Sequence, residues 1–137
     1  MFLSGGMDFS LMRALVIDDN EFVRFMVEKH LVGFGFQKVF SADDGFEGLR
    51  LLTREKPDVV ICDINMRPVN GFEFLKQVRR LETPLRSVPV IFLTSHADEN
   101  FVKKAIELQI DAYLLKPVMP IFLKKHIMKI MEQRLRA

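Results

Sequence analysis

The chain has 137 residues, of which 49% are hydrophobic and 28% are charged, with a formal net charge of +2. This composition supports one domain with a real core, excludes a disordered chain, and gives no argument for direct nucleic-acid binding. The single cysteine, Cys62, excludes a disulfide framework, and no apolar stretch approaches the length of a membrane span, so we expect a cytoplasmic protein without membrane insertion.

The first 12 residues contain no basic region followed by an apolar core, so they are not a secretory signal peptide. We expect residues 1–12 to be a flexible extension outside the fold. Residues 13–137 are then expected to form the domain.

From residue 14 onward, short apolar runs alternate with longer amphipathic stretches. The predicted strands are residues 14–17, 37–41, 59–63, 88–93 and 112–115, and the predicted helices are residues 21–32, 43–54, 71–81, 98–108 and 120–134. Strands that alternate with helices predict an α/β fold with a parallel sheet covered on both faces. At this length we expect a flavodoxin-like (βα)5 doubly wound sheet with strand order 2-1-3-4-5.

The first predicted helix has a plausible N-cap in Asn20 and a plausible end at Gly33 or Gly35. Positions at 100° intervals put Phe22 and Phe25 on a different arc from the apolar face. These two rings either pack at the edge of the core or form an exposed docking surface for a partner protein, because exposed aromatics make good anchors.

The strand of residues 59–63 is an apolar run without helical period, which predicts burial on both faces and a central position. It ends in Asp63, at the edge of the sheet where ligands bind in open α/β folds. Other strands end in Asp18 and Asp19, in Thr94, and in Lys116. Four of five strands therefore deliver reactive polar groups to one edge.

Strands 1 and 3 are neighbours in the expected order, so Asp18, Asp19 and Asp63 converge. Carboxylates that lie this close repel one another unless a cation compensates, and sites made of carboxylate oxygens suit Mg²⁺. A divalent cation beside Lys116 and the Thr94 hydroxyl provides the groups that phosphoryl transfer needs, with Asp63 as the nucleophile.

At these residues the chain closely resembles the receiver domain of two-component response regulators, in particular the single-domain kind related to chemotaxis regulators. The resemblance covers residues 13–133, with Asp63 44 positions after Asp19 and Lys116 22 positions after Thr94. Its motifs are residues 16–20, residues 60–66, Gly71, residues 94–95 and residues 113–117.

The resemblance implies that Asp63 accepts a phosphoryl group from a histidine kinase or a histidine phosphotransfer protein in phosphorelay signal transduction. It implies that Asp19 binds Mg²⁺ directly, that Asp18 binds it mainly through water, and that the backbone carbonyl of Asn65 is a further ligand. The protein would then be a phosphoacceptor switch with self-catalysed phosphotransfer and autodephosphorylation, not an enzyme with a turnover substrate.

The resemblance also implies that Lys116 and Thr94 contact the phosphoryl group. Tyr113 would turn inward when Thr94 moves, and the Lys116–Pro117 peptide would be cis. The switched surface would bind a downstream protein target and would support dimerisation on phosphorylation.

Asn65 and His96 lie where receiver domains tune the lifetime of the phosphoryl group. For His96, a solvent-exposed loop residue without such a role is an equally good interpretation. Two positions depart from the common family pattern. Arg67 stands before Pro68 in the loop after Asp63, and Gln109 stands where a glycine is common at a left-handed turn.

Two other functional classes share the fold or the type of site. A Mg²⁺-dependent phosphatase with an aspartyl-phosphate intermediate, resembling the haloacid dehalogenases, would need an acid/base carboxylate two residues after Asp63, where Asn65 stands. A flavin-binding electron carrier would need a phosphate-binding loop after the first strand, where Asp18 and Asp19 would repel the phosphate.

Overall fold

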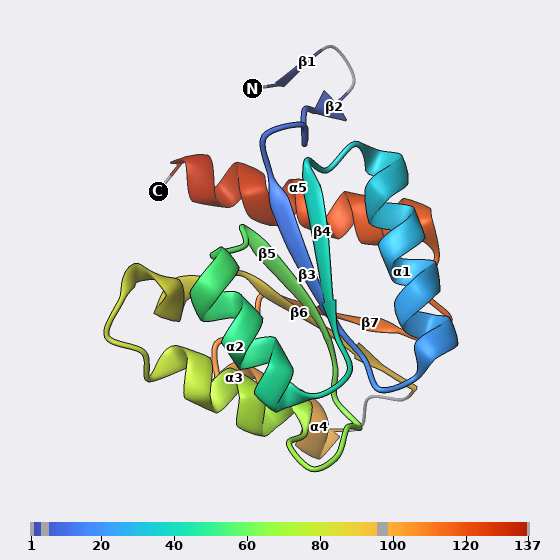
Figure 1. The fold of residues 1–137 in the computed structure, drawn as a ribbon. Coiled ribbons are helices and arrows are strands. Elements are labelled where there is room, and N and C mark those ends of the chain that lie inside the picture. The colour runs from blue at the N-terminus through green and yellow to red at the C-terminus, as the bar shows by residue number, and fades with distance from the viewer. Residues whose placement is uncertain (1, 4–5, 96–98, 137) are drawn as a thin grey trace.

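The computed structural model describes residues 2–3, 6–95 and 99–136. Parallel strands form a five-stranded sheet in the order β4-β3-β5-β6-β7, which confirms the predicted order 2-1-3-4-5. Helices α1 and α5 cover one face, and α2, α3 and α4 cover the other (Figure 1). The strands of this sheet are β3 (Arg13–Ile17), β4 (Lys38–Ala42), β5 (Val59–Asp63), β6 (Val90–Thr94) and β7 (Ala112–Leu115).

The helices also follow the predicted order, with ends shifted by a few residues. They are α1 (Glu21–Phe34), α2 (Gly45–Glu55), α3 (Gly71–Arg79), α4 (Glu99–Glu107) and α5 (Pro120–Arg136). A short 3-10 helix, η1 (Pro84–Ser87), was not predicted. None of the helices in the described ranges has both the length and the hydropathy of a bilayer span.

Side chains of the central strands alternate between two hydrophobic clusters. In β3, Ala14 and Val16 face α1 and α5, whereas Leu15 and Ile17 face α2 and α3. Strands β5 and β6 alternate in the same way, and all their residues are buried. This two-sided burial explains why the strands appear in the sequence as continuous apolar runs.

Helix α1 begins and ends as the sequence predicts. The Asn20 side chain accepts a hydrogen bond from the amide of Val23, and Gly35 ends the helix at φ 100°. Phe22 and Phe25 are 72% and 56% exposed, and neither packs against the hydrophobic clusters. Their role as a docking surface stays a prediction.

The first 12 residues correct the predicted domain boundary. A small hairpin pairs β1 (Phe2–Leu3) with β2 (Gly6–Met7), and Met7 and Phe9 are buried in the cluster beneath α1 and α5. The ring of Phe9 stacks on that of Phe36, with centroids 4.7 Å apart and an interplanar angle of 7°. Met7 and Phe9 therefore belong to the core, although the sequence analysis left them outside the fold.

This packing predicts a stability cost for Phe9→Ala. Phe9 is 1% exposed, and removing a buried phenylalanine ring costs about 3 kcal/mol in transfer and cavity energy. Urea unfolding should show this loss, while the control Leu11→Ala, at a side chain that is 83% exposed, should change the free energy of unfolding by less than about 0.5 kcal/mol. Equal effects of the two substitutions would place Phe9 outside the stabilising core.

Candidate functional site

The polar groups predicted to meet at the carboxyl edge of the sheet do so. Asp18 follows β3, Asp63 is the last residue of β5, Thr94 is the last residue of β6, and Lys116 follows β7. Main-chain hydrogen bonds fix these strand ends: the amide of Lys116 donates to the carbonyl of Thr94 at 2.8 Å, and the amide of Asp18 donates to the carbonyl of Ala42 at 3.1 Å.

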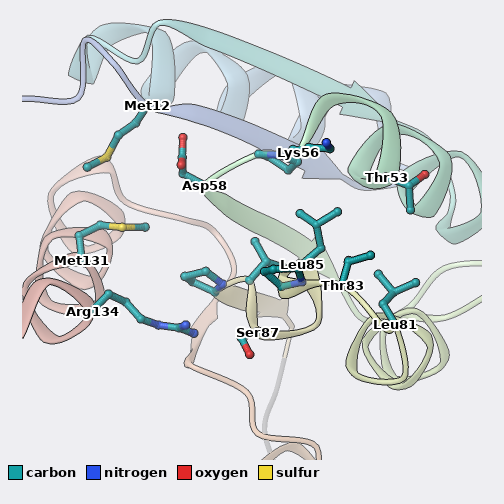
Figure 2. Close-up of a pocket in the computed structure, with 14 residues that line it drawn as sticks. Met12, Thr53, Lys56, Asp58, Leu81, Thr83, Leu85, Ser87, Met131 and Arg134 are labelled. Atoms are coloured by element: carbon teal, nitrogen blue, oxygen red, sulfur yellow. The ribbon is translucent and has the colours of Figure 1, made fainter. Parts of the chain in front are cut away.

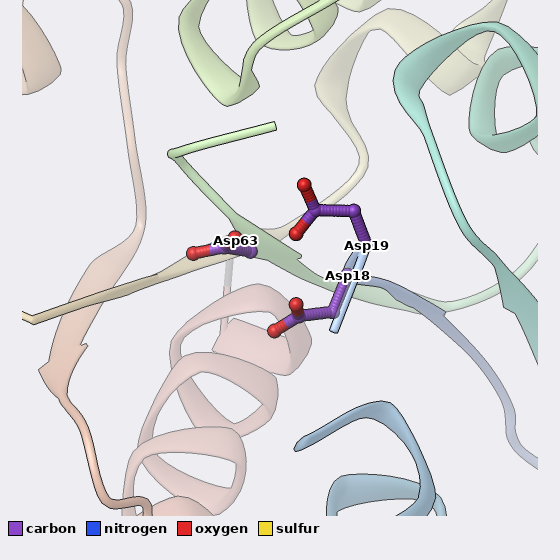
Figure 3. Close-up of side chains that lie close together, drawn as sticks. All are labelled: Asp18, Asp19 and Asp63. Carbon is purple, nitrogen blue, oxygen red and sulfur yellow. The ribbon is translucent and has the colours of Figure 1, made fainter. Parts of the chain in front are cut away.

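Three carboxyl groups lie together at this edge. Asp18, Asp19 and Asp63 each offer an oxygen, and these atoms all lie within 4.8 Å of one another (Figure 3). Asp18 is fully buried and Asp63 is 2% exposed, whereas Asp19 is open to solvent. The cluster therefore consists of two buried carboxyl groups and one that water reaches.

Lys116 carries the positive charge that faces this cluster. Its Nζ lies 3.0 Å from Oδ1 of Asp63 and 3.4 Å from Oδ2 of Asp18. Burial works against the charged form of Lys116, but the two carboxylates outweigh it, so the pKa of this lysine lies above its ordinary value.

Apart from this ammonium, the same two carboxylate oxygens have no polar partner in the described part of the chain. Asp18 Oδ2 and Asp63 Oδ1 are buried and accept no hydrogen bond from any other group among the described residues. Burial, reinforced by the charge of Asp63, raises the pKa of Asp18 against the opposing effects of the Asn20 amide and Lys116. Negative charge at the site is therefore incompletely compensated.

This donor set fits a hard divalent cation. Two buried carboxylate oxygens lack hydrogen-bond donors and a third carboxylate is exposed, which matches the preference of Mg²⁺ for carboxylate oxygen together with retained water. Asn65, the remaining predicted ligand, follows Asp63 by two residues and has an exposed side chain. The ligand role of its carbonyl stays a prediction.

Two hydrogen bonds hold Asp18, and the sequence analysis predicted neither of them. Its Oδ1 accepts a hydrogen bond from the amide of Asn20 at 2.9 Å. Its carbonyl accepts one from Nη1 of Arg24 at 2.8 Å, so a side chain from the first turn of α1 fixes the end of β3. The i, i+6 spacing of the two residues was the only available signal.

Gly71 allows α3 to start against the strand that carries Asp63. A Cβ at this position would lie 2.7 Å from the carbonyl oxygen of Asp63 and 2.8 Å from the Cα of Ile64. The amide of Gly71 donates to the carbonyl of Ile64 at 2.9 Å. This close approach explains the glycine eight residues after Asp63.

The predicted switch residues lie on the neighbouring strands β6 and β7. Thr94 is 2% exposed, while Tyr113 is 39% exposed. The ring of Tyr113 meets that of Phe101 edge to face, with centroids 5.7 Å apart, a contact that the sequence analysis did not foresee. His96 lies outside the described residues.

Of the two departures from the family pattern, Gln109 keeps the expected backbone conformation, whereas the backbone at Arg67 has a feature that was not predicted, a cis peptide before Pro68. Gln109 adopts φ 58°, so the predicted left-handed turn after α4 is present without a glycine. The Lys116–Pro117 peptide is cis, as predicted, and Arg67–Pro68 is also cis. Arg67 itself is exposed.

Comparison with known proteins gives consistent results. Residues 14–128 match the family described as "Response regulator receiver domain". The chain is 32% identical to the chemotaxis protein CheY-3 of Vibrio cholerae, over 89% of this chain and 93% of that protein. It is 33% identical to the chemotaxis protein CheY homolog of Campylobacter jejuni, over 85% and 89% of the two chains.

Among solved structures, a putative response regulator from Chloroflexus aurantiacus superposes with a TM-score of 0.80 at 30% identity, covering 88% of this chain and 98% of that one. This agreement extends the likeness from the sequence to the whole fold.

The charge imbalance predicts that Asp63→Asn stabilises the protein when divalent cations are absent. One ammonium faces three carboxyl groups, so removing a negative charge relieves repulsion and should raise the free energy of unfolding by about 1 kcal/mol at neutral pH. Urea unfolding in EDTA measures this, with Asp43→Asn at an exposed carboxylate as the matched control. A loss of stability in Asp63→Asn would mean that Lys116 already compensates the cluster.

Proposed function

The chain belongs to the response regulator receiver family, whose members act in phosphorelay signalling, and we propose that Asp63 is its phosphoacceptor. One observation carries this proposal. Asp63 ends the central strand, is almost fully buried, and has the ammonium of Lys116 3.0 Å from Oδ1.

The donor is a phosphohistidine on a histidine kinase or on a histidine phosphotransfer protein. A carboxylate oxygen of Asp63 attacks the phosphorus, a P–O bond forms, and the P–N bond breaks with its electron pair leaving on the imidazole. The Lys116 ammonium and the Thr94 hydroxyl stabilise the charge that develops on the phosphoryl oxygens.

Asp18, Asp19, Asp63 and the carbonyl of Asn65 are the residues that would hold Mg²⁺. When bound, the ion supplies charge neutralisation for the phosphoryl oxygens. Asp19 is the exposed member and Asp18 the fully buried one, so solvent reaches the site from the side of Asp19. The proposal that Asp19 binds directly and Asp18 mainly through water rests on the family resemblance.

The protein acts as a phosphoacceptor switch and not as an enzyme that turns over free substrates. Phosphotransfer and autodephosphorylation are catalysed by its own site, and Asn65 and His96 tune the lifetime of the phosphoryl group. No observation favours the phosphatase alternative, because Asn65 replaces the acid/base carboxylate that such an enzyme would need.

Phosphorylation changes the surface through Thr94 and Tyr113. The Tyr113 side chain is 39% exposed, and we expect its inward movement to break the edge-to-face contact with Phe101. The phosphoryl group draws Thr94 toward it, and the space that Thr94 leaves receives the Tyr113 ring.

Partner binding completes the function. Phe22 and Phe25 are exposed on α1, whose amino end lies beside the acidic site, and they form an anchor for the phosphotransfer partner. The phosphorylated form acts on a downstream protein target, as the chemotaxis proteins among its relatives suggest, rather than on nucleic acid, and phosphorylation favours dimerisation. A cytoplasmic location remains a prediction.

The phosphoacceptor assignment predicts the loss of phosphoryl incorporation in Asp63→Asn. Labelling from a phosphorylated histidine kinase should fall at least about 100-fold, because the amide is a far weaker nucleophile than the carboxylate. The transfer is followed by autoradiography with Mg²⁺ and with EDTA, and EDTA should slow the wild-type reaction. Asp43→Asn should react like the wild type. Normal labelling of Asp63→Asn would overturn the assignment.

The switch can be followed by fluorescence because the chain has one tyrosine and no tryptophan. Beryllofluoride with Mg²⁺ imitates a phosphoryl group on Asp63, and we expect it to bury Tyr113. Acrylamide should then quench the tyrosine emission less than in the free protein. Asp63→Asn should show no change, and unchanged quenching in the wild type would contradict the proposed role of Tyr113.

A further inference from the structure

A pocket of about 870 Å³ lies at the amino edge of the sheet, opposite the carboxylates (Figure 2). Its walls come from α5, from η1, and from the residues that precede β3, β5 and β6. We propose that this pocket binds a small amphipathic organic anion, a molecule with an apolar body and one carboxylate or similar group.

The walls are predominantly apolar. Met12 and Met131 face each other across one end, and Pro57, Leu85 and Val88 contribute further carbon surface. A volume of this size is within the range that encloses small organic molecules, and methionine side chains adapt to ligands of irregular shape. The body of the ligand is therefore apolar.

The η1 wall is held in place before any ligand arrives. Nη1 of Arg79, on α3, donates hydrogen bonds of 2.9 Å to the carbonyls of Arg86 and Val88. Nη2 of the same guanidinium donates to the carbonyl of Gln109 at 3.1 Å. A largely buried arginine thus ties the 3-10 helix to α3 and to the turn after α4, so the ligand does not have to order this wall.

The charge around the pocket favours an anion. Arg134 extends from α5 toward η1 in Figure 2, and its Nη2 lies 3.2 Å from Oδ1 of Asp111. The other oxygen of Asp111 faces Arg79 at 3.4 Å and accepts a hydrogen bond from the amide of Val90. Two guanidinium groups share one carboxylate here, so positive charge remains available on Arg134, whose side chain is 41% exposed.

The other charged groups of the lining do not reverse this balance. The carboxylate of Asp58 is engaged, because its Oδ2 accepts a hydrogen bond of 2.8 Å from the amide of Arg13. Lys56, at the end of α2, adds a second cation to the rim. An apolar body with a single anionic group therefore matches both the walls and the rim.

Octanoate is a suitable probe, and 1-octanol is its neutral counterpart with the same number of carbons. Amide signals of Leu85, Ser87 and Val88 in ¹⁵N–¹H spectra should shift saturably with octanoate. The neutral alcohol should bind about fivefold more weakly, which is the effect expected of one partly exposed ion pair. Shifts that avoid these residues, or equal binding of the two probes, would overturn the proposal.

Matched substitutions localise the anion. Arg134→Gln should weaken octanoate binding about fivefold, whereas Arg86→Gln, on η1 but outside the lining, should change it by less than about twofold. Because Arg134→Gln also removes a contact of Asp111, a second pair is needed. Ser87 is exposed at the rim, so Ser87→Glu should bind octanoate about fivefold more weakly than Ser87→Gln does. The affinity for 1-octanol should be the same in both variants.

Equal losses in Arg134→Gln and Arg86→Gln, or equal affinities in the two Ser87 variants, would show that no anion is held at this rim. The pocket is independent of the phosphoacceptor assignment, so octanoate should bind Asp63→Asn as it binds the wild type.

Discussion

The ammonium of Lys116 is the contact on which the chemistry of this protein depends. It lies between the two buried carboxylates, 3.0 Å from Asp63 and 3.4 Å from Asp18, and it cannot neutralise both of them together with Asp19. The excess negative charge favours a further cation at this edge of the sheet, which is the basis for the Mg²⁺ that we propose. The same negative charge would repel an anionic phosphoryl group, so phosphoryl transfer to Asp63, as proposed, would need that cation together with Lys116.

The fold maintains this unfavourable charge cluster by making everything behind it apolar. Strands β3, β5 and β6 send alternate side chains to two hydrophobic clusters. Apart from Arg13 at the start of β3, their charged and hydroxyl groups stand at or directly after the carboxyl ends. The stability of the sheet thus comes from residues that take no part in the chemistry. Lys116 follows the edge strand β7, which ends in register with Thr94 of β6. The hydrogen bond from the Lys116 amide to the Thr94 carbonyl fixes this register, so the lysine side chain can reach the carboxylates.

Much of this arrangement was predictable because topology alone brings strand ends together. Once the apolar runs are placed in the order 2-1-3-4-5, Asp18, Asp63, Thr94 and Lys116 must meet at one edge, and they do. Features that depend on side-chain direction were not predictable. Whether Phe101 faces Tyr113 depends on how α4 is oriented about its own axis. The sequence pattern of a nine-residue helix does not define that orientation.

The N-terminal segment was misjudged for a related reason. Residues 7–11 alternate apolar and polar side chains, a pattern typical of a half-buried extended segment, but the sequence analysis left this short stretch outside the fold. Its place in the core depends on a partner, Phe36, that lies far along the chain after α1. Apolar residues outside regular elements can be placed only once the surface that they cover is known.

Strand β5 runs from the pocket at the amino edge of the sheet to the acidic site at the carboxyl edge. Pro57 and Asp58 line the pocket just before the strand, and Asp63 ends it. Five residues at about 3.3 Å each separate the two ends by roughly 16 Å. At an effective dielectric constant of about 20, two unit charges at that distance interact by about 1 kcal/mol, so the charge of an anion in the pocket would act only weakly on the acidic site. The packing of β5 against β6 also links the two ends, because Thr94 ends β6 beside Asp63 at the end of β5.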